Sequence, residues 1–282
     1  MHKFEYHEPA TIGEAAALLR TYGDQAKIMA GGTDLLVRFR KGVIQPQHVV
    51  NIKKIPGLDL IAAGKDGLMI GAAVSMYETE RFLAGFPQYR VLSQAIHSVA
   101  SCQIRNRATV AGNICNASPA ADTLPALVVL GAQVGISGEQ GDRWVAVENF
   151  FAGPGKTVLM SGEMVSGILL PPAPRDAKGI YLKQSRRPLV DLAIVGLAAF
   201  TDGSATKIAL GSVAPTVVRA QAAEMLLAEK GLSRETALEA AKLTVMAATP
   251  ISDIRGSRDY RLALVEVLAQ RALLALCGGE KA

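Results

Sequence analysis

Residues 109–132 read TVAGNICNASPAADTLPALVVLGA, and the first half of this stretch carries few bulky side chains. Glycine, alanine and small polar residues come first, and an apolar run begins after Asp122. A backbone without large side chains can approach a bound anion closely, and threonine and asparagine add hydrogen-bonding groups. We therefore interpret residues 109–113 as a loop that holds an anion such as a pyrophosphate, ahead of a buried element.

A second segment has the same character. Residues 30–34, AGGTD, combine two glycines with a hydroxyl residue and precede another apolar run. Such a loop offers main-chain N–H groups to an anion. Tight turns between core elements are the alternative for both loops, and the residues alone leave the two interpretations open.

The composition is that of an ordinary globular protein and argues against nucleic acid as a partner. Of the 282 residues, 50% are hydrophobic and 20% charged, which suits roughly two compact domains. The net charge of +5 is scattered along the chain, and aromatic residues make up only 5%. A nucleic-acid-binding protein more often has a basic stripe interleaved with aromatic residues.

The sequence also indicates neither a membrane segment nor a metal site. No stretch approaches the roughly 18 apolar residues of a spanning helix, and the start MHKFEYHEP does not resemble a signal peptide, so we expect a cytoplasmic protein. The three cysteines, Cys102, Cys115 and Cys277, lack the spacing of a disulfide framework, a zinc site or an iron–sulfur site. The histidines are dispersed, and we expect them to be surface or packing residues: His2, His7, His48 and His97.

Hydrophobic periodicity predicts an α+β chain in three parts, residues 1–56, 57–174 and 175–282. In the first part, Thr11 and Glu14 form a capping box before a helix that Gly23 ends, and strands follow in a βαβ-like unit. The second part has two hairpins, two helices and a further strand, and the proline-rich segment 171–174 is the predicted linker. The third part has three strands, at 179–185, 193–200 and 206–213, and three helices, at 219–230, 233–248 and 260–276.

Familiar catalytic and nucleotide-binding motifs are missing. No G-x-G-x-x-G follows a strand, and FAGPGKT has Phe150 where a P-loop needs its first glycine. There is no G-x-S-x-G and no H-E-x-x-H. We therefore assign no catalytic residue and no metal ligand.

Five ordered segments span nearly the whole chain: AGGTDLL (30–36), TVAGNICNASPAADTLPAL (109–127), YLKQSRR (181–187), GSVAPTVVRA (211–220) and DIRGSRDYR (253–261). Together they resemble the FAD-binding medium subunit of molybdenum hydroxylases, the family of xanthine dehydrogenase, carbon monoxide dehydrogenase and aromatic hydroxylase assemblies. The resemblance implies a PCMH-type FAD-binding fold of two α+β subdomains, similar to vanillyl-alcohol oxidase. A C-terminal domain with a three-stranded antiparallel sheet and helices would follow it.

The resemblance also implies a set of cofactor contacts. The main-chain N–H groups that would wrap the FAD pyrophosphate belong to Met29, Ala30, Gly31, Gly32, Thr33, Asp34 and Leu35. The second side of the cofactor would be lined by Ala100, Thr109, Gly112, Asn113 and Ser118. Asp122 would accept a hydrogen bond from a ribose or flavin-chain hydroxyl. Val165 would pack near the adenine, Lys183 would reach toward the flavin, and Leu192 would lie beside the isoalloxazine.

Several of these residues have simpler interpretations. Asp122 and Asp34 each precede a predicted helix, so either carboxylate could be an N-cap. Lys183 could be a solvated strand lysine. Ala111 stands where many relatives have glycine, which costs about 1 kcal/mol if that position needs a positive φ and nothing otherwise.

The resemblance implies an oxidoreductase subunit that carries electrons. A large molybdopterin subunit would hydroxylate the substrate, and a small [2Fe-2S] subunit would pass electrons to FAD in this chain, in an assembly with two copies of each subunit. FAD would release them to an external acceptor such as NAD, oxygen or a quinone. The low cysteine content argues against the inserted four-iron cluster found in some relatives. The alternatives are a stand-alone flavin oxidoreductase of the same fold and a cofactor-free scaffolding subunit.

Overall fold

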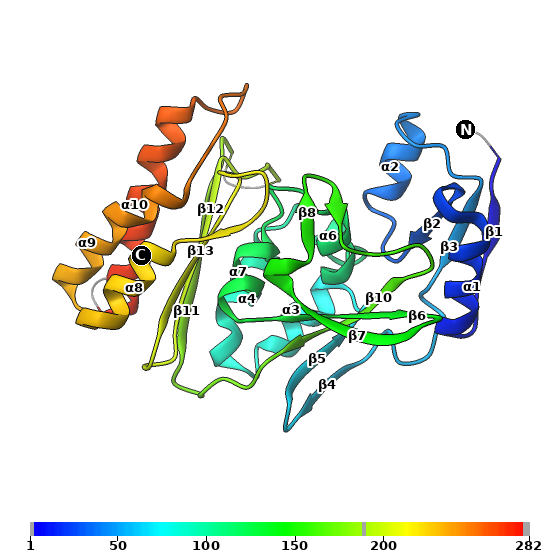
Figure 1. Ribbon diagram of the computed structural model, residues 1–282, viewed down its shortest axis with the longest axis horizontal. Helices are drawn as coiled ribbons and strands as arrows, with labels where there is room; N and C mark the ends of the chain where they lie inside the picture. Colours follow the sequence, from blue (N-terminus) through cyan, green and yellow to red (C-terminus); the bar gives the residue numbers. More distant parts are fainter. Residues whose placement is uncertain (1–2, 188–189, 279–282) are drawn as a thin grey trace.

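The computed structural model describes residues 3–187 and 190–278 and has its larger sheets arranged in sequence along the longest axis (Figure 1). A parallel sheet lies near the N-terminus, an antiparallel sheet with helices occupies the middle, and a second antiparallel sheet with helices lies at the other end. The chain is thus α+β, as predicted. No helix in the described part of the chain is long and apolar enough to span a membrane.

The N-terminal sheet has the order β1-β3-β2, with all pairs parallel. Its elements are β1 (Glu5–His7), α1 (Ile12–Tyr22), β2 (Ala26–Met29), α2 (Leu35–Arg40) and β3 (His48–Asn51). Thr11 Oγ1 accepts the Glu14 N–H at 3.1 Å, and Gly23 ends α1, which confirms the predicted N-cap and glycine stop. The predicted capping box does not close, because Glu14 Oε2 accepts the Ala10 N–H at 2.8 Å and not that of Thr11. The short edge strand β1 was not predicted.

The middle sheet has the order β4-β5-β10-β6-β7 and is antiparallel. Its strands are β4 (Ile61–Gly64), β5 (Gly67–Gly71), β6 (Gln133–Gly138), β7 (Gly141–Ala146) and β10 (Met164–Leu170). Both predicted hairpins, β4–β5 and β6–β7, are confirmed. Residues of the FAGPGKT segment form a small separate hairpin of β8 (Phe151–Gly153) and β9 (Lys156–Thr157).

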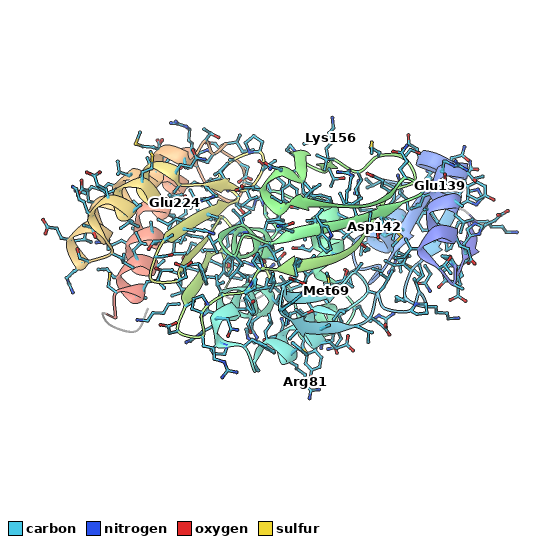
Figure 2. The ribbon with its side chains drawn as sticks, turned by 60° about the horizontal axis from the view of Figure 1, so that its bottom comes forward. Met69, Arg81, Glu139, Asp142, Lys156 and Glu224 are labelled. Atoms are coloured by element: carbon cyan, nitrogen blue, oxygen red, sulfur yellow. The ribbon has the colours of Figure 1, made fainter. Side chains whose placement is uncertain are left out.

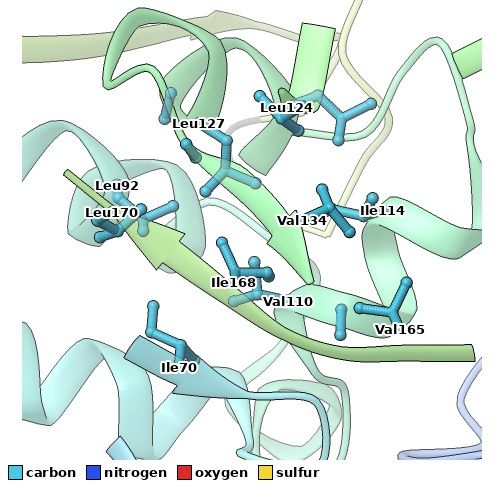
Figure 3. Close-up of a cluster of buried hydrophobic side chains, with 14 of the residues drawn as sticks. Ile70, Leu92, Val110, Ile114, Leu124, Leu127, Val134, Val165, Ile168 and Leu170 are labelled. Atoms are coloured by element: carbon cyan, nitrogen blue, oxygen red, sulfur yellow. The ribbon is translucent and has the colours of Figure 1, made fainter. Parts of the chain in front are cut away.

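Helices of the middle part build the larger core together with this sheet and the sheet at the far end of the molecule. They are α3 (Met76–Leu83), α4 (Arg90–His97), α5 (Cys102–Arg105), α6 (Val110–Asn116) and α7 (Thr123–Val129). Figure 3 shows Val110 and Ile114 of α6 beside Val165 and Ile168 of β10. Apolar burial of this kind supplies most of the driving force for folding.

The C-terminal sheet has the order β11-β12-β13-β14 and is followed by three helices. The elements are β11 (Lys178–Gln184), β12 (Val195–Thr201), β13 (Thr206–Gly211), β14 (Val218–Arg219), α8 (Gln221–Lys230), α9 (Arg234–Thr244) and α10 (Arg258–Leu276). The expected three-stranded sheet is therefore wrong by one strand. Strand β14 pairs with β13 over only two residues, which is too short for a period-two signal in the sequence.

Both faces of the C-terminal sheet are buried. Ala198 and Phe200 of β12 belong to the core shared with the middle part, whereas Leu197 and Ala199 belong to the core beneath α8–α10. This alternation follows from the period of two along a strand. Charged side chains lie outside these layers; Arg81 and Lys156 project from opposite sides of the molecule in Figure 2.

Candidate functional site

A cavity of about 430 Å³ opens where four segments meet. Its lining consists of Asp34, Val99, Ala100, Asn113, Asn116, Ser118, Ala120, Ala121, Asp122, Arg187, Val190, Asp191 and Leu192. The volume falls in the range of about 300 to 1,000 Å³ that small-molecule and cofactor sites have. The cavity thus draws on both loops singled out in the sequence and on the segment after β11.

The predicted site residues divide into two groups with respect to this cavity. Those that line it are Asp34, Ala100, Asn113, Ser118, Asp122 and Leu192. Those outside its lining are Met29, Ala30, Gly31, Gly32, Thr33, Leu35, Thr109, Gly112, Val165 and Lys183. The contacts of all sixteen with a cofactor remain predictions.

The first loop, residues 30–34, lies directly against residues 107–108, which precede the second predicted loop. A Cβ atom added to Gly31 would lie 1.9 Å from the Arg107 carbonyl oxygen, which is an impossible contact. Gly32 has a φ of 72°, in the region that favours glycine. The two glycines are therefore needed both for the close approach of the two segments and for the turn between them.

The main-chain N–H groups of Gly31, Gly32, Thr33 and Asp34 have no hydrogen-bond acceptor among residues 3–187 and 190–278. Asp34 occupies the N-cap position of α2 but makes no side-chain capping bond, so the capping interpretation of this residue is wrong. A run of unpaired amides at a loop beside a cavity is suited to an anionic group. This arrangement fits the pyrophosphate of a dinucleotide.

Residues 109–113 are the first turn of a helix, not the loop that the sequence suggested. Thr109 is the N-cap of α6, and its Oγ1 accepts the Gly112 N–H at 2.8 Å. Asn113 Oδ1 accepts the Thr123 hydroxyl at 2.6 Å, so its carbonyl is engaged while its amide nitrogen, at the cavity, has no acceptor in the described residues. Gly112 therefore serves the helix cap, and Asn113 is the residue of this turn that lines the cavity. Ala111 is helical and costs nothing, because its φ is not positive.

Two alanines near the cavity hold left-handed backbone conformations. Ala100, which lines the cavity, has a φ of 44°, and Ala117 at the C-cap of α6 has a φ of 47°. Such a conformation costs a non-glycine residue about 1 to 2 kcal/mol, and strain of this kind gathers at functional sites. The backbone around α6 is therefore held in place by the surrounding packing.

Asp122 lies at the centre of a buried polar cluster on the cavity wall. Its Oδ2 accepts from Lys183 Nζ at 2.8 Å, and its Oδ1 accepts from the Tyr181 hydroxyl at 2.8 Å. Lys183 also donates to the Ser98 carbonyl at 3.1 Å. Asp122 makes no side-chain capping bond, and the Lys183 side chain is only 11% exposed, so both simpler interpretations of these residues are wrong.

Burial raises the pKa of Asp122, and the ammonium of Lys183 and the hydroxyl of Tyr181 oppose that shift. Burial followed by the charge of Asp122 raises the pKa of Tyr181 well above its usual range, so this residue stays a phenol that donates. Each Asp122 oxygen accepts one of these two bonds and keeps a further lone pair. The carboxylate is thus held in place and can still accept from a ligand hydroxyl in the cavity.

The room for this cluster comes from one glycine. Gly196 of β12 lies opposite Lys183 in the β11–β12 register, and a Cβ added to it would lie 2.8 Å from the Tyr181 hydroxyl oxygen. Any side chain at position 196 would therefore displace the hydroxyl from Asp122. Gly196 thus supports the site although it does not line the cavity.

Three further predicted residues lie in different surroundings. Leu192 is exposed at the cavity, and Ser118 Oγ accepts the Ala120 N–H at 3.3 Å in the turn between α6 and α7. Val165 is buried in the core between β10 and α6, away from the cavity lining (Figure 3). The structure brings Ser118 and Leu192 to the cavity and leaves Val165 in the core.

Two family descriptions match the chain in succession. Residues 2–173 match the FAD binding domain in molybdopterin dehydrogenase, and residues 180–276 match the CO dehydrogenase flavoprotein C-terminal domain. The chain belongs to this flavoprotein family. It is an FAD-binding medium subunit of the molybdenum hydroxylase type, and its homologues are subunits of oxidoreductases.

Known proteins of the family resemble the chain over nearly its whole length. The carbon monoxide dehydrogenase medium chain of Hydrogenophaga pseudoflava is 32% identical over 97% of this chain and 96% of its own length. The xanthine dehydrogenase FAD-binding subunit of Escherichia coli O157:H7 is 31% identical over 98% and 97%. The solved carbon monoxide dehydrogenase of Hydrogenophaga pseudoflava superposes with a TM-score of 0.92 at 33% identity, covering 97% of each chain. Quinoline 2-oxidoreductase from Pseudomonas putida 86 superposes with a TM-score of 0.90 at 29% identity, covering 98% of each.

Sequence reasoning missed Tyr181 and seven of the thirteen residues that line the cavity. Asn116, Arg187 and Asp191 are polar residues of the lining, and the Tyr181 hydroxyl donates a hydrogen bond to Asp122. Tyr181 stands in the quoted YLKQSRR segment two residues before Lys183, on the same face of a strand, so its role could have been inferred from the strand period. Asn116 and Asp191 lie close to the predicted residues Asn113, Ser118 and Leu192, but no pattern in the sequence singled out these two side chains.

Proposed function

We propose that this chain is the electron-transfer subunit of a molybdenum hydroxylase complex, with FAD held in the cavity between residues 31–34 and 113–122. The unpaired amides of residues 31–34, a loop whose Asp34 lines the same cavity as Asp122, support this proposal most directly. Partner subunits with a molybdopterin centre and [2Fe-2S] clusters would be its electron source, in an assembly with two copies of each chain. A PCMH-type division at residues 56/57 and 174/175 is part of the same proposal.

The residues of the chain have separate tasks in this proposal. The amides of residues 31–34 bind the pyrophosphate, and the closely packed Gly31 keeps that loop against residues 107–108. Asp122 accepts from a hydroxyl of the cofactor, oriented by Tyr181 and Lys183. Bound there, FAD accepts electrons singly and releases them in pairs, a chemistry that belongs to the cofactor. Leu192 and Val190 are exposed at the cavity and would limit the access of water to it.

The experiment compares the chain alone with the chain purified together with the subunits that accompany it. We expect flavin absorbance in both samples and reduction of the flavin by substrate only in the complex. Flavin-free protein would favour the scaffolding alternative, and substrate turnover by the chain alone would favour a stand-alone oxidoreductase.

The loop assignments have their own test. Gly32→Val and Asp122→Ala should both lower FAD occupancy, because the first forces a strained φ beside the amides and the second removes the hydroxyl acceptor. Occupancy is the ratio of flavin absorbance to protein absorbance. Full occupancy in both variants would contradict the assignments while leaving the family membership intact.

A further inference from the structure

Two of the dispersed histidines meet at the edge of the N-terminal sheet. In the parallel pairing of β1 with β3, Glu5 lies opposite His48, and His7 is two residues after Glu5. Residues two apart share a face of a strand, so Glu5, His7 and His48 lie on one face. Figure 1 shows β1, β3 and α1 together at the end of the molecule opposite the C-terminal sheet.

The ligand atoms of these three side chains face one another. His7 Nε2 and His48 Nδ1 are 3.0 Å apart. Glu5 Oε2 lies 3.4 Å from His48 Nδ1 and 3.9 Å from His7 Nε2. Ligand atoms about 2.0 to 2.1 Å from a tetrahedral zinc ion are separated by about 3.3 Å from one another, so the three atoms already approximate one face of such a tetrahedron.

Packing fixes the two imidazole rings. The Tyr22 ring at the end of α1 stacks on His48 with centroids 3.5 Å apart and planes 14° from parallel, and it also stacks on His7 at 5.6 Å. The side chains of His7 and His48 are 19% and 11% exposed, whereas Glu5 is 71% exposed. The site is thus a preorganised histidine pair with a carboxylate that can close over it from the solvent side.

We propose that Glu5, His7 and His48 bind one divalent transition-metal ion, Zn²⁺ being the ion to test first, with water as the fourth ligand. Imidazole nitrogens suit zinc, copper and nickel, whereas magnesium and calcium take oxygen ligands. Without metal the two rings share a single hydrogen bond, and metal binding requires the donor ring to carry its proton on the outer ring nitrogen instead. The bound ion ties the three-residue strand β1 to β3 and so secures the edge of the sheet.

The outer ring nitrogens set the expected strength of binding. Within residues 3–187 and 190–278, His7 Nδ1 and His48 Nε2 make no hydrogen bond. Such outer partners typically raise metal affinity by about 10- to 100-fold. We therefore expect weaker binding than in a closed four-ligand zinc site.

The test is a calorimetric titration of the full chain, as purified with its flavin and stripped of metal by a chelator, with ZnCl₂. We expect one Zn²⁺ per wild-type chain and a rise in the unfolding temperature in the presence of zinc. His7→Gln and Glu5→Gln should each weaken zinc binding at least tenfold and abolish the zinc-dependent rise. Glu5 is exposed and glutamine keeps a polar side chain at both positions, so we expect both variants to keep the sheet, and unchanged flavin absorbance would show it.

Matched controls separate this site from other zinc ligands. His97→Gln changes an exposed histidine that pairs with Glu80, and Cys102→Ser removes an exposed thiol, so both should bind zinc like the wild type. Replacing Zn²⁺ by Co²⁺ should give the intense visible bands of tetrahedral cobalt in the wild type and not in His7→Gln. Unchanged zinc binding in His7→Gln, or no zinc binding by the wild type, would overturn the proposal.

Discussion

Two ion pairs hold the C-terminal part of this protein in place, one buried and one between the buried Arg261 and the partly exposed Asp253. Asp122 and Lys183 meet at 2.8 Å on the wall of the cavity, between the middle part and β11. Asp253 and Arg261 meet at 2.7 Å, away from the cavity lining. Arg261 also donates to the Ile194 carbonyl at 2.7 Å and the Ser212 carbonyl at 2.9 Å, so it ties α10 to the ends of β12 and β13.

The charge of the two carboxylates is compensated to different degrees. Burial tends to raise the pKa of Asp253, but hydrogen bonds from Arg255 and then Arg261 outweigh it and hold that pKa well below its usual range. Asp122 has one cation and one phenol, and burial prevails, so its pKa is raised. The structural pair is saturated with donors, whereas the pair at the cavity keeps acceptor capacity. An acid that is poorly compensated by its own chain and lines a cavity is a candidate for ligand binding.

The largest effect is expected at the structural pair. Arg261→Met leaves Asp253 and two main-chain carbonyls without their buried donor, and each buried acceptor left unpaired costs about 1 to 3 kcal/mol. Urea unfolding followed by circular dichroism measures this loss. The exposed Arg258→Met, three residues away in α10, is the control and should change stability by less than about 0.5 kcal/mol. An Arg261→Met protein as stable as that control would remove the distinction between the pairs.

The pair at the cavity should respond mainly in cofactor binding. Asp122→Asn keeps the size of the side chain but removes the charge, and losing a hydrogen bond to a charged group costs about 1.5 to 3 kcal/mol, or roughly 10- to 100-fold in FAD affinity. Flavin fluorescence during reconstitution of the apoprotein measures the affinity. Asp142→Asn, on an exposed strand residue labelled in Figure 2, is the matched control. Equal affinity in the two variants would place Asp122 among purely structural residues.

Lowering the pH should change the contributions of Asp253 and Asp122 to the free energy of unfolding in opposite directions. The lowered pKa of Asp253 means that its contribution is present above the unfolded-chain pKa of about 3.9 and is lost as pH falls through the folded value. The raised pKa of Asp122 acts in the opposite sense: its contribution is present below about 3.9 and is lost as pH rises through the folded value. Each group changes the slope of stability against pH by at most about 1.4 kcal/mol per unit. Urea midpoints measured between pH 3 and pH 7 should therefore fall less steeply toward acid in Asp253→Asn than in the wild type, and more steeply in Asp122→Asn.

The smallest effect on FAD affinity is expected when only the Tyr181 hydroxyl is displaced from Asp122. Gly196→Ala places a methyl group 2.8 Å from the Tyr181 hydroxyl and displaces it from Asp122, which costs one hydrogen bond of about 1 kcal/mol, or roughly fivefold in FAD affinity. Gly64→Ala has open space around its added Cβ and serves as the control in the same reconstitution assay. If Gly196→Ala binds FAD as tightly as Gly64→Ala, the phenol does not orient the carboxylate.

Local sequence patterns predicted much of the fold but few of the contacts in the site. The N-cap and glycine stop of α1, the two larger hairpins and the three C-terminal helices follow from spacing and turn residues, whereas α5, α6 and the β8–β9 hairpin were not predicted. Strands β1 and β14 have three and two residues, too few for a periodic pattern. The bond from Tyr181 to Asp122 spans 59 residues and that between His7 and His48 spans 41, so only the tertiary fold brings these partners together. Residues 109–113 were misjudged because Thr109 and Gly112 belong to a helix cap that also tolerates small residues.

Because both faces of the C-terminal sheet are buried, they affect how the protein unfolds. Gly196, Ala198 and Ala209 lie on the side shared with the middle part, and the neighbouring residues in each strand lie on the other side. Separating the middle part from the C-terminal sheet would expose apolar surface on α4, α7 and the sheet together, at a cost of about 25 cal/mol per Å². The chain should therefore unfold as one cooperative unit, although it matches two family descriptions.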